Sequence, residues 1–169
     1  MTSDANPILT VGHSNHRLER LIELLDMNRT TSVADVRSVP YSRLHPDFNR
    51  ESLQRALGVH GIRYVFLGRE LGARSDDSSC YEDGRVQYRK LAQTELFREG
   101  VARVMSEAKS HRVALLCAEK EPLACHRSLL VARELESLGA SILHIQADGS
   151  LEPHADSLRG CDGISPIIV

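Results

Sequence analysis

Apolar residues along the chain occur in two patterns: short continuous runs, and longer segments in which they recur every three or four positions. The runs are typical of strands buried on both faces, and the recurring segments are typical of amphipathic helices. The runs predict five strands, at residues 8–14, 30–38, 62–68, 112–117 and 140–146. The recurring segments predict four longer helices, at residues 17–28, 51–61, 94–110 and 126–139.

Strands and helices alternate along the chain, and this order favours an α/β fold. The predicted architecture is a mostly parallel sheet of about five strands with helices on both faces, a three-layer sandwich. Residues 68–85 lack periodicity and predict a long surface loop. The length fits one domain over residues 1–169, with a poorly patterned C-terminal tail from about residue 147.

The predicted helix at residues 126–139 carries an apolar stripe and an end signal. Gly139 follows the last periodic residue and predicts the C-terminal stop. The residues expected to seat this helix on the sheet are Leu129, Leu130, Ala132 and Leu135.

Polar side chains gather directly after four of the predicted strands. In open α/β sheets ligands bind outside the carboxyl ends of the strands, so these clusters should meet at one edge. Loops are polar in every α/β protein, but the density of reactive side chains here favours a site. The candidates are Gly12, His13, Ser14, Asp35, Arg37, Pro40, Ser42, Cys117, Glu119, Cys125, His126 and Arg127.

Composition narrows the function classes. The formal net charge is −2, so no global field attracts nucleic acid, although a local basic patch stays possible. Aromatic residues make up only 4% and Trp is absent, which disfavours a stacking platform for single strands. No apolar run approaches the length of a membrane span.

The four cysteines lie at positions 80, 117, 125 and 161. The N-terminus lacks the basic and apolar regions of a signal peptide, so we expect a cytoplasmic protein with reduced thiols. In that compartment a close cysteine pair indicates metal binding, redox chemistry or catalysis more often than a structural disulfide.

Cys117 is the predicted nucleophile, because it ends a strand and faces the start of a helix, where a thiolate is stabilised. The alternative is a buried, inert thiol. Cys125 is expected to support Cys117 or to pack under the first helical turn. A metal site from Cys117, Cys125 and His126, with His13 as fourth ligand, is conceivable, but the spacing is not that of zinc ribbons, and no metal or other cofactor is predicted.

Charged residues around Cys117 suggest proton transfer and anion binding. Glu119 or His126 is the expected proton carrier. Arg37 and Arg127 are expected to orient an anionic substrate, with Asp35 holding an arginine. An alternative of equal weight is that both arginines form structural ion pairs. The loop after Cys117 carries Glu119 and another carboxylate, which would repel an unpaired phosphate.

The remaining candidates are assigned to substrate binding. They are the residues directly after the first strand, one residue in the loop after the second strand, and the second cysteine of the pair. Ser14 is also a candidate helix cap, and more so than a nucleophile. The residues of this group are Gly12, His13, Ser14, Ser42 and, with them, Cys125.

Four motifs in order, "TVGHS", "DVRSVPYSR", "FLGRELG" and "LLCAEKEPLACHRSLLVARELESLG", resemble the widespread bacterial family catalogued as domain of unknown function 488. The resemblance implies a compact α/β domain and no assigned activity. "VADVRS" and the segment from "VALLC" onward are more distantly similar to rhodaneses, a resemblance that implies Cys117 as a sulfur carrier. The longer loop, with its proline and two glutamates, departs from that pattern.

These observations favour an enzyme with a thiol-based site at the carboxyl edge of the sheet. It would act by hydrolysis or group transfer on a small anionic or nucleotide-like ligand. The alternatives are a non-enzymatic module that binds a nucleotide or nucleic acid, and a Cys/His metal site. The geometric expectation is one pocket lined by His13, Asp35, Arg37, Cys117 and Arg127.

Overall fold

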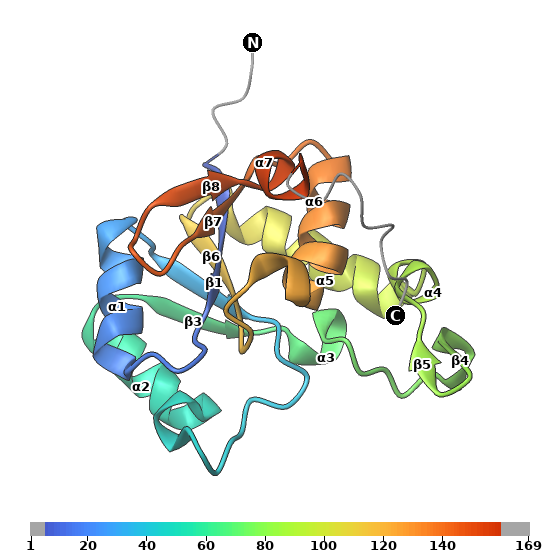
Figure 1. The fold of residues 1–169 in the computed structure, drawn as a ribbon, viewed down its shortest axis with the longest axis horizontal. Helices are drawn as coiled ribbons and strands as arrows, with labels where there is room; N and C mark the ends of the chain where they lie inside the picture. The colour runs from blue at the N-terminus through green and yellow to red at the C-terminus, as the bar shows by residue number, and fades with distance from the viewer. Residues whose placement is uncertain (1–5, 160–169) are drawn as a thin grey trace.

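A six-stranded sheet forms the centre of the molecule, in the order β3-β2-β6-β1-β7-β8 (Figure 1). The computed structural model describes residues 6–159. The strands are β1 (Ile8–Gly12), β2 (Ser32–Asp35), β3 (Arg63–Phe66), β6 (Val113–Cys117), β7 (Ile142–Ile145) and β8 (Leu151–Pro153).

In this sheet β3, β2, β6, β1 and β7 pair in parallel, and β8 runs antiparallel to β7. The prediction of a mostly parallel sheet is therefore confirmed. The five predicted strands correspond to β1, β2, β3, β6 and β7. The sixth, β8, has three residues and ends in Pro153, so it shows no alternation that a pattern could reveal.

Helices cover both faces of the sheet, which confirms the three layers. In Figure 1, α1 (Leu18–Met27) and α2 (Arg50–Val59) lie on one side, and α5 (Glu95–Glu107) and α6 (Arg133–Ser137) lie on the other. The shorter elements are η1 (Pro46–Phe48), α3 (Gly68–Leu71), η2 (Ser78–Cys80), β4 (Tyr81–Glu82), β5 (Arg85–Val86), α4 (Tyr88–Ala92), η3 (Pro122–Ala124), η4 (Arg127–Ala132) and α7 (His154–Arg159).

Two apolar cores follow from the alternation of side chains along the central strands. On β1, Leu9 and Val11 pack with α1 and α2, whereas Ile8 packs in the core under α5 and α6. Residues two apart share a face of a strand, so Thr10 points to the same side as Ile8. Thr10 is therefore a polar residue of β1 that lies beneath η4, the helix that follows the loop between Cys117 and Cys125.

The stretch at residues 68–85 is more ordered than a plain loop. It contains α3, the 3₁₀ turn η2 and the hairpin of β4 and β5. Each element has only two to four residues. Elements this short bury too few side chains to show a period, so the sequence pattern cannot separate them from a loop. The prediction of an irregular loop is wrong here.

The predicted helix at residues 126–139 begins as a π-helix, η4, and continues as α6. Gly139 adopts φ +89°, the left-handed conformation that ends helices, as its position predicted. Leu130, Ala132 and Leu135 are buried, but Leu129 is 38% exposed, so its predicted place in the stripe is wrong.

The segment after residue 147 contains β8 and α7, which the sequence pattern did not predict. The rest of the predicted tail, from residue 160, lies outside the described residues. Among the helices of residues 6–159, none combines the length and the apolar character needed to cross a bilayer.

Candidate functional site

The carboxyl ends of β1, β6 and β2 lie next to one another at the centre of the sheet. Gly12 is level with Cys117 across the β1–β6 pair, and Asp35 is level with Leu116 across the β2–β6 pair. Beyond the strands, the His13 N–H donates to the Cys117 carbonyl at 3.0 Å. The order and parallel direction of the strands thus bring all four predicted polar clusters to one edge, since β3 runs parallel to β2 and Phe66 is level with Asp35.

Gly12 allows the loop after β6 to fold over the end of β1. A Cβ at this position would collide with the Glu119 carbonyl. The Ser14 N–H also donates to the Ala118 carbonyl at 2.9 Å, which continues the contact beyond the strand. Gly12 is therefore a packing position that shapes the loop, and its predicted contact with a substrate stays a prediction.

Cys117 and Cys125 form a contact pair at the two ends of this loop. Their Sγ atoms lie 2.8 Å apart, with the Cys125 thiol donating to Cys117, and neither is in a disulfide. The two residues are only 4% and 3% exposed. A ligand that reaches them must therefore be small, or be admitted by movement of the loop.

His126 completes the group. Its Nε2 lies 2.9 Å from the Val36 carbonyl, and this bond assigns a proton to Nε2. Nδ1 then faces the sulfurs, 3.7 Å from Cys117 Sγ and 3.8 Å from Cys125 Sγ. The imidazole is thus oriented by the backbone of β2 to exchange a proton with either thiol.

The electrostatics of the group distinguish the two cysteines. The hydrogen bond from Cys125 lowers the pKa of Cys117 despite its burial, and His126 and the Glu119 N–H act in the same direction. The same hydrogen bond, together with burial, raises the pKa of Cys125. Burial opposes a charge on His126, but the bond to Cys117 raises its pKa overall. The favoured state is a Cys117 thiolate beside a Cys125 thiol and an imidazolium.

Arg127 is 1% exposed and holds the loop from within. One terminal nitrogen donates to the Glu119 carbonyl, and the other donates to the Lys120 carbonyl at 3.0 Å. Its Nε donates to Thr10 Oγ1 at 3.3 Å. These hydrogen bonds all go to the protein, so Arg127 positions the loop that carries Cys117, and its predicted contact with an anion stays a prediction.

A buried polar chain continues from Arg127 into the sheet. Thr10 Oγ1 lies 2.6 Å from His144 Nδ1, and His144 Nε2 lies 2.9 Å from His154 Nδ1. Both histidines are almost fully buried. Sequence reasoning missed these residues, although a polar residue inside a buried apolar strand, as in "ILTVG" and "ILHI", is a signal because its polar atoms need a partner.

Asp35 and Arg37 form a buried ion pair at the end of β2. Arg37 binds both carboxylate oxygens, at 2.9 and 2.7 Å, and also donates to the Phe48 carbonyl at 2.9 Å. The Tyr64 hydroxyl donates to Asp35 at 2.6 Å, and burial with the nearby carboxylate raises the pKa of Tyr64. The structural ion pair predicted for Arg37 is therefore present, and its predicted contact with an anion stays a prediction.

His13 lies on the Asp35–Arg37 side of the site. Its ring stacks on Phe48 with centroids 4.4 Å apart, and its Nδ1 lies 3.1 Å from the Ser14 carbonyl. Burial, and then the charge of Arg37, lower the pKa of His13. Burial thus favours the neutral form of His13, while the nearby Cys117 acts in the opposite direction and raises its pKa.

Ser42 and Glu119 are the two remaining candidates. The Ser42 hydroxyl accepts from the N–H groups of Leu44 and His45, both at 3.2 Å, and so shapes its own loop. The Glu119 residue is exposed, and its backbone, not its side chain, contacts Cys117 and Arg127. Tyr88, which sequence reasoning missed, is near the thiol pair, since burial and the two sulfurs raise its pKa.

Cys117, Cys125 and His126 are the residues of the described chain whose donor atoms could hold a metal, since these atoms lie within 4.8 Å of one another. Tetrahedral Zn²⁺ with Zn–S near 2.3 Å and Zn–N near 2.05 Å separates sulfur from nitrogen by about 3.6 Å and the sulfurs by about 3.8 Å. The two sulfur–nitrogen distances fit this geometry. The sulfur–sulfur contact is about 1 Å too short for it.

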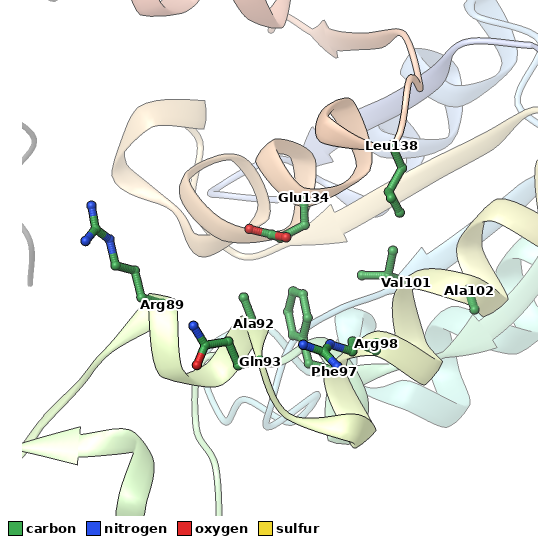
Figure 2. A pocket seen from close by; sticks show the side chains of 9 residues that line it. All are labelled: Arg89, Ala92, Gln93, Phe97, Arg98, Val101, Ala102, Glu134 and Leu138. Atoms are coloured by element: carbon green, nitrogen blue, oxygen red, sulfur yellow. The ribbon is translucent and has the colours of Figure 1, made fainter.

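Two hollows lie outside the cluster of Cys117, Cys125 and His126. One, between α4, α5 and α6, is lined mainly by apolar side chains and by none of the predicted site residues (Figure 2). The other, of about 360 Å³, lies beside the cysteine loop and includes Gly12, His16 and Lys120 in its lining. The reactive side chains lie together in the cluster of Cys117, Cys125 and His126, so we place the candidate site there rather than in the apolar hollow.

The comparison with known families agrees with the motifs. The model of the family described as "Domain of unknown function DUF488" matches residues 17–133. The match contains the whole segment from Cys117 to Arg127 and begins after the corner at Gly12. No curated protein and no solved structure matches the chain. The similarity to rhodaneses therefore rests on the sequence pattern alone.

Proposed function

Since the chain belongs to the DUF488 family, whose name assigns no activity, its chemistry has to be inferred from the site, and we propose that it is a cysteine-dependent enzyme. Cys117 is the nucleophile, Cys125 donates the hydrogen bond that stabilises its thiolate, and His126 carries the proton. The reaction class is hydrolysis or group transfer on a small ligand.

The observation that carries this proposal is the 2.8 Å contact between Cys117 and Cys125 with one imidazole behind both sulfurs. A thiol becomes a strong nucleophile when its thiolate is stabilised and a proton carrier is within reach. An inert core cysteine needs neither partner. Among the two proton carriers that the sequence suggested, His126 has its ring at the sulfurs, whereas the Glu119 residue is exposed.

The nature of the ligand is the less supported part of the proposal. We keep a small anionic or nucleotide-like molecule as the candidate, because Lys120 and His16 line the adjoining hollow, together with the carboxylates of Glu121 and Asp148. The guanidinium groups of Arg37 and Arg127 both make hydrogen bonds within the protein, and their contact with an anion is part of this proposal. A role in the cytoplasm and the possible binding of nucleic acid remain proposals of the same kind.

Alkylation by iodoacetamide at about pH 6 tests the nucleophile, because an ordinary thiol is almost entirely protonated there. Site-resolved mass spectrometry of the full chain should show Cys117 labelled faster than Cys80, which is equally buried. Cys125→Ser should slow this labelling while leaving Cys80 unchanged. Equal, slow labelling of both cysteines in the wild type would reject the enzyme and favour a non-enzymatic binding module.

A metal centre is the second candidate, favoured by the three donor atoms and by the Val36 carbonyl that fixes Nδ1 of His126 toward the sulfurs. Elemental analysis of the purified protein tests it. Stoichiometric zinc that is lost in His126→Ala would support this candidate. Absence of metal from protein purified without chelator, and no uptake of added Zn²⁺, would leave the thiol enzyme as the function.

A further inference from the structure

A nucleophilic cysteine does not require a second thiol in van der Waals contact with it. The presence of Cys125 at this position therefore suggests a further role for that residue. If Cys117 attacked a carbon atom, the adduct would be released by water or by an acceptor. If Cys117 attacked an oxygen–oxygen bond, it would become a sulfenic acid, which a neighbouring thiol converts to a disulfide. The position of Cys125 matches the second case.

We propose that the pair reduces small peroxides, with Cys117 as the peroxide-attacking thiol and Cys125 as the thiol that resolves the sulfenic acid. The inference rests on the proposed function, since it uses the same Cys117 nucleophile, and it specifies the substrate class. Two contacts carry it: the 2.8 Å separation of the sulfurs, and the equal reach of His126 Nδ1 to both of them.

The geometry requires little movement for the second step. A disulfide has its sulfurs about 2.05 Å apart, so the sulfurs approach by only about 0.8 Å. A resolving thiol that is already in contact leaves the sulfenic acid little time to be oxidised further. The low exposure of both cysteines, 4% and 3%, favours a small oxidant such as hydrogen peroxide over a bulky one.

The steps balance as follows. The Cys117 thiolate attacks one peroxide oxygen, an S–O bond forms, the O–O bond breaks, and the leaving hydroxide takes the proton of the His126 imidazolium to become water. Cys125 then gives its proton to His126 Nδ1 and attacks the Cys117 sulfur. An S–S bond forms, the S–O bond breaks, and the second hydroxide leaves as water with that proton. The peroxide gains two electrons, the dithiol loses two, and a small external dithiol restores both thiols by exchange.

The experiment uses the full chain, reduced, freed of reductant and treated with equimolar hydrogen peroxide. Mass spectrometry without reduction should show a disulfide that joins Cys117 to Cys125, formed at least roughly tenfold faster than Cys80 is oxidised. Dithiothreitol should reverse it. Cys125→Ser should accumulate a sulfenic acid on Cys117, trapped by dimedone, and Cys117→Ser should form neither product. Cys80→Ser should behave as the wild type.

Failure of this inference is separable from failure of the proposed function. If iodoacetamide labels Cys117 rapidly while peroxide gives no Cys117–Cys125 disulfide, the peroxide role is overturned and the nucleophile stands. If Cys117 proceeds to sulfinic acid while Cys125 stays a free thiol, Cys125 is no resolving residue and the inference is equally overturned. If neither reagent distinguishes Cys117 from Cys80, both proposals fail together.

Discussion

The buried hydrogen-bonded network from Arg127 through Thr10 and His144 to His154 should make the stability of the protein decrease in mild acid. His144 has no exposed surface, and its Nδ1 and Nε2 lie within hydrogen-bond distance of the Thr10 hydroxyl and of His154. Since Thr10 Oγ1 accepts from Arg127, we assign the hydroxyl proton to the bond with Nδ1 and the ring proton to Nε2. In this arrangement both histidines are neutral. Burial, and then the neighbouring His154 and the charge of Arg127, lower the pKa of His144 to about 3. A proton on Nδ1 would place a second cation next to the group that binds Arg127.

The sign and size of the effect follow from linkage. An unfolded histidine titrates at about 6.5, so below that pH the unfolded state binds a proton that folded His144 refuses. The stability due to the neutral ring is fully present above about pH 6.5 and is lost as the pH falls toward the folded pKa of about 3. Between pH 7 and pH 5 the free energy of unfolding should drop by about 2 kcal/mol from this residue alone.

Urea unfolding followed by circular dichroism, repeated from about pH 7 to pH 5, measures this slope. His144→Gln should be less stable than the wild type at pH 7 but should lose less stability on acidification, since the other titrating groups are common to both chains. Leu138→Ala, which replaces an exposed side chain that does not titrate, should keep the wild-type slope. If the free energies of unfolding of the wild type and His144→Gln fell in parallel with pH, neutral His144 would not be the source of this stability.

Three further changes test the packing and the site. Leu135→Ala should cost about 2–5 kcal/mol, because Leu135 is fully buried, while Leu138→Ala, 62% exposed, should cost about 1 kcal/mol or less in the same urea assay. Gly12→Ala should lose about 1–3 kcal/mol, seen as a lower melting temperature, because its methyl group meets the Glu119 carbonyl; an unchanged melting temperature would mean that the loop does not pack on β1. His126→Asn should slow alkylation of Cys117 by about tenfold at about pH 6 without changing that of Cys80, and an unchanged rate would remove His126 from the site.

The fold was largely accessible from the sequence, because long apolar runs and helical periods dominate it. The runs that became β1, β2, β6 and β7 are buried along their whole length or nearly so, which is why continuous apolar residues revealed them. The elements that the pattern missed are short, such as β8 and the hairpin of β4 and β5. The family resemblance was confirmed by the match over residues 17–133.

The site was only partly accessible, because contacts between distant residues have no local pattern. The place of Cys117 at a strand end followed from the apolar run before it. That Cys125 folds back to within 2.8 Å of it depends on Arg127, which holds the loop from inside. The sequence could not show that Arg127 is buried, nor that Thr10 and His144 support it, since burial is decided by the packing of β1 and β7 against η4.

The rate of alkylation of Cys117 as a function of pH tests the central claim most directly. Site-resolved rates for the wild type, Cys125→Ser and Arg127→Ala should be compared over the range from about pH 4 to pH 9, which spans both perturbed and ordinary thiols. The account predicts a wild-type Cys117 that titrates well below the ordinary thiol value of about 8.5, shifting upward in both variants. A Cys117 that titrates near 8.5 in all three proteins would contradict the account, because the Cys125 hydrogen bond would then stabilise no thiolate.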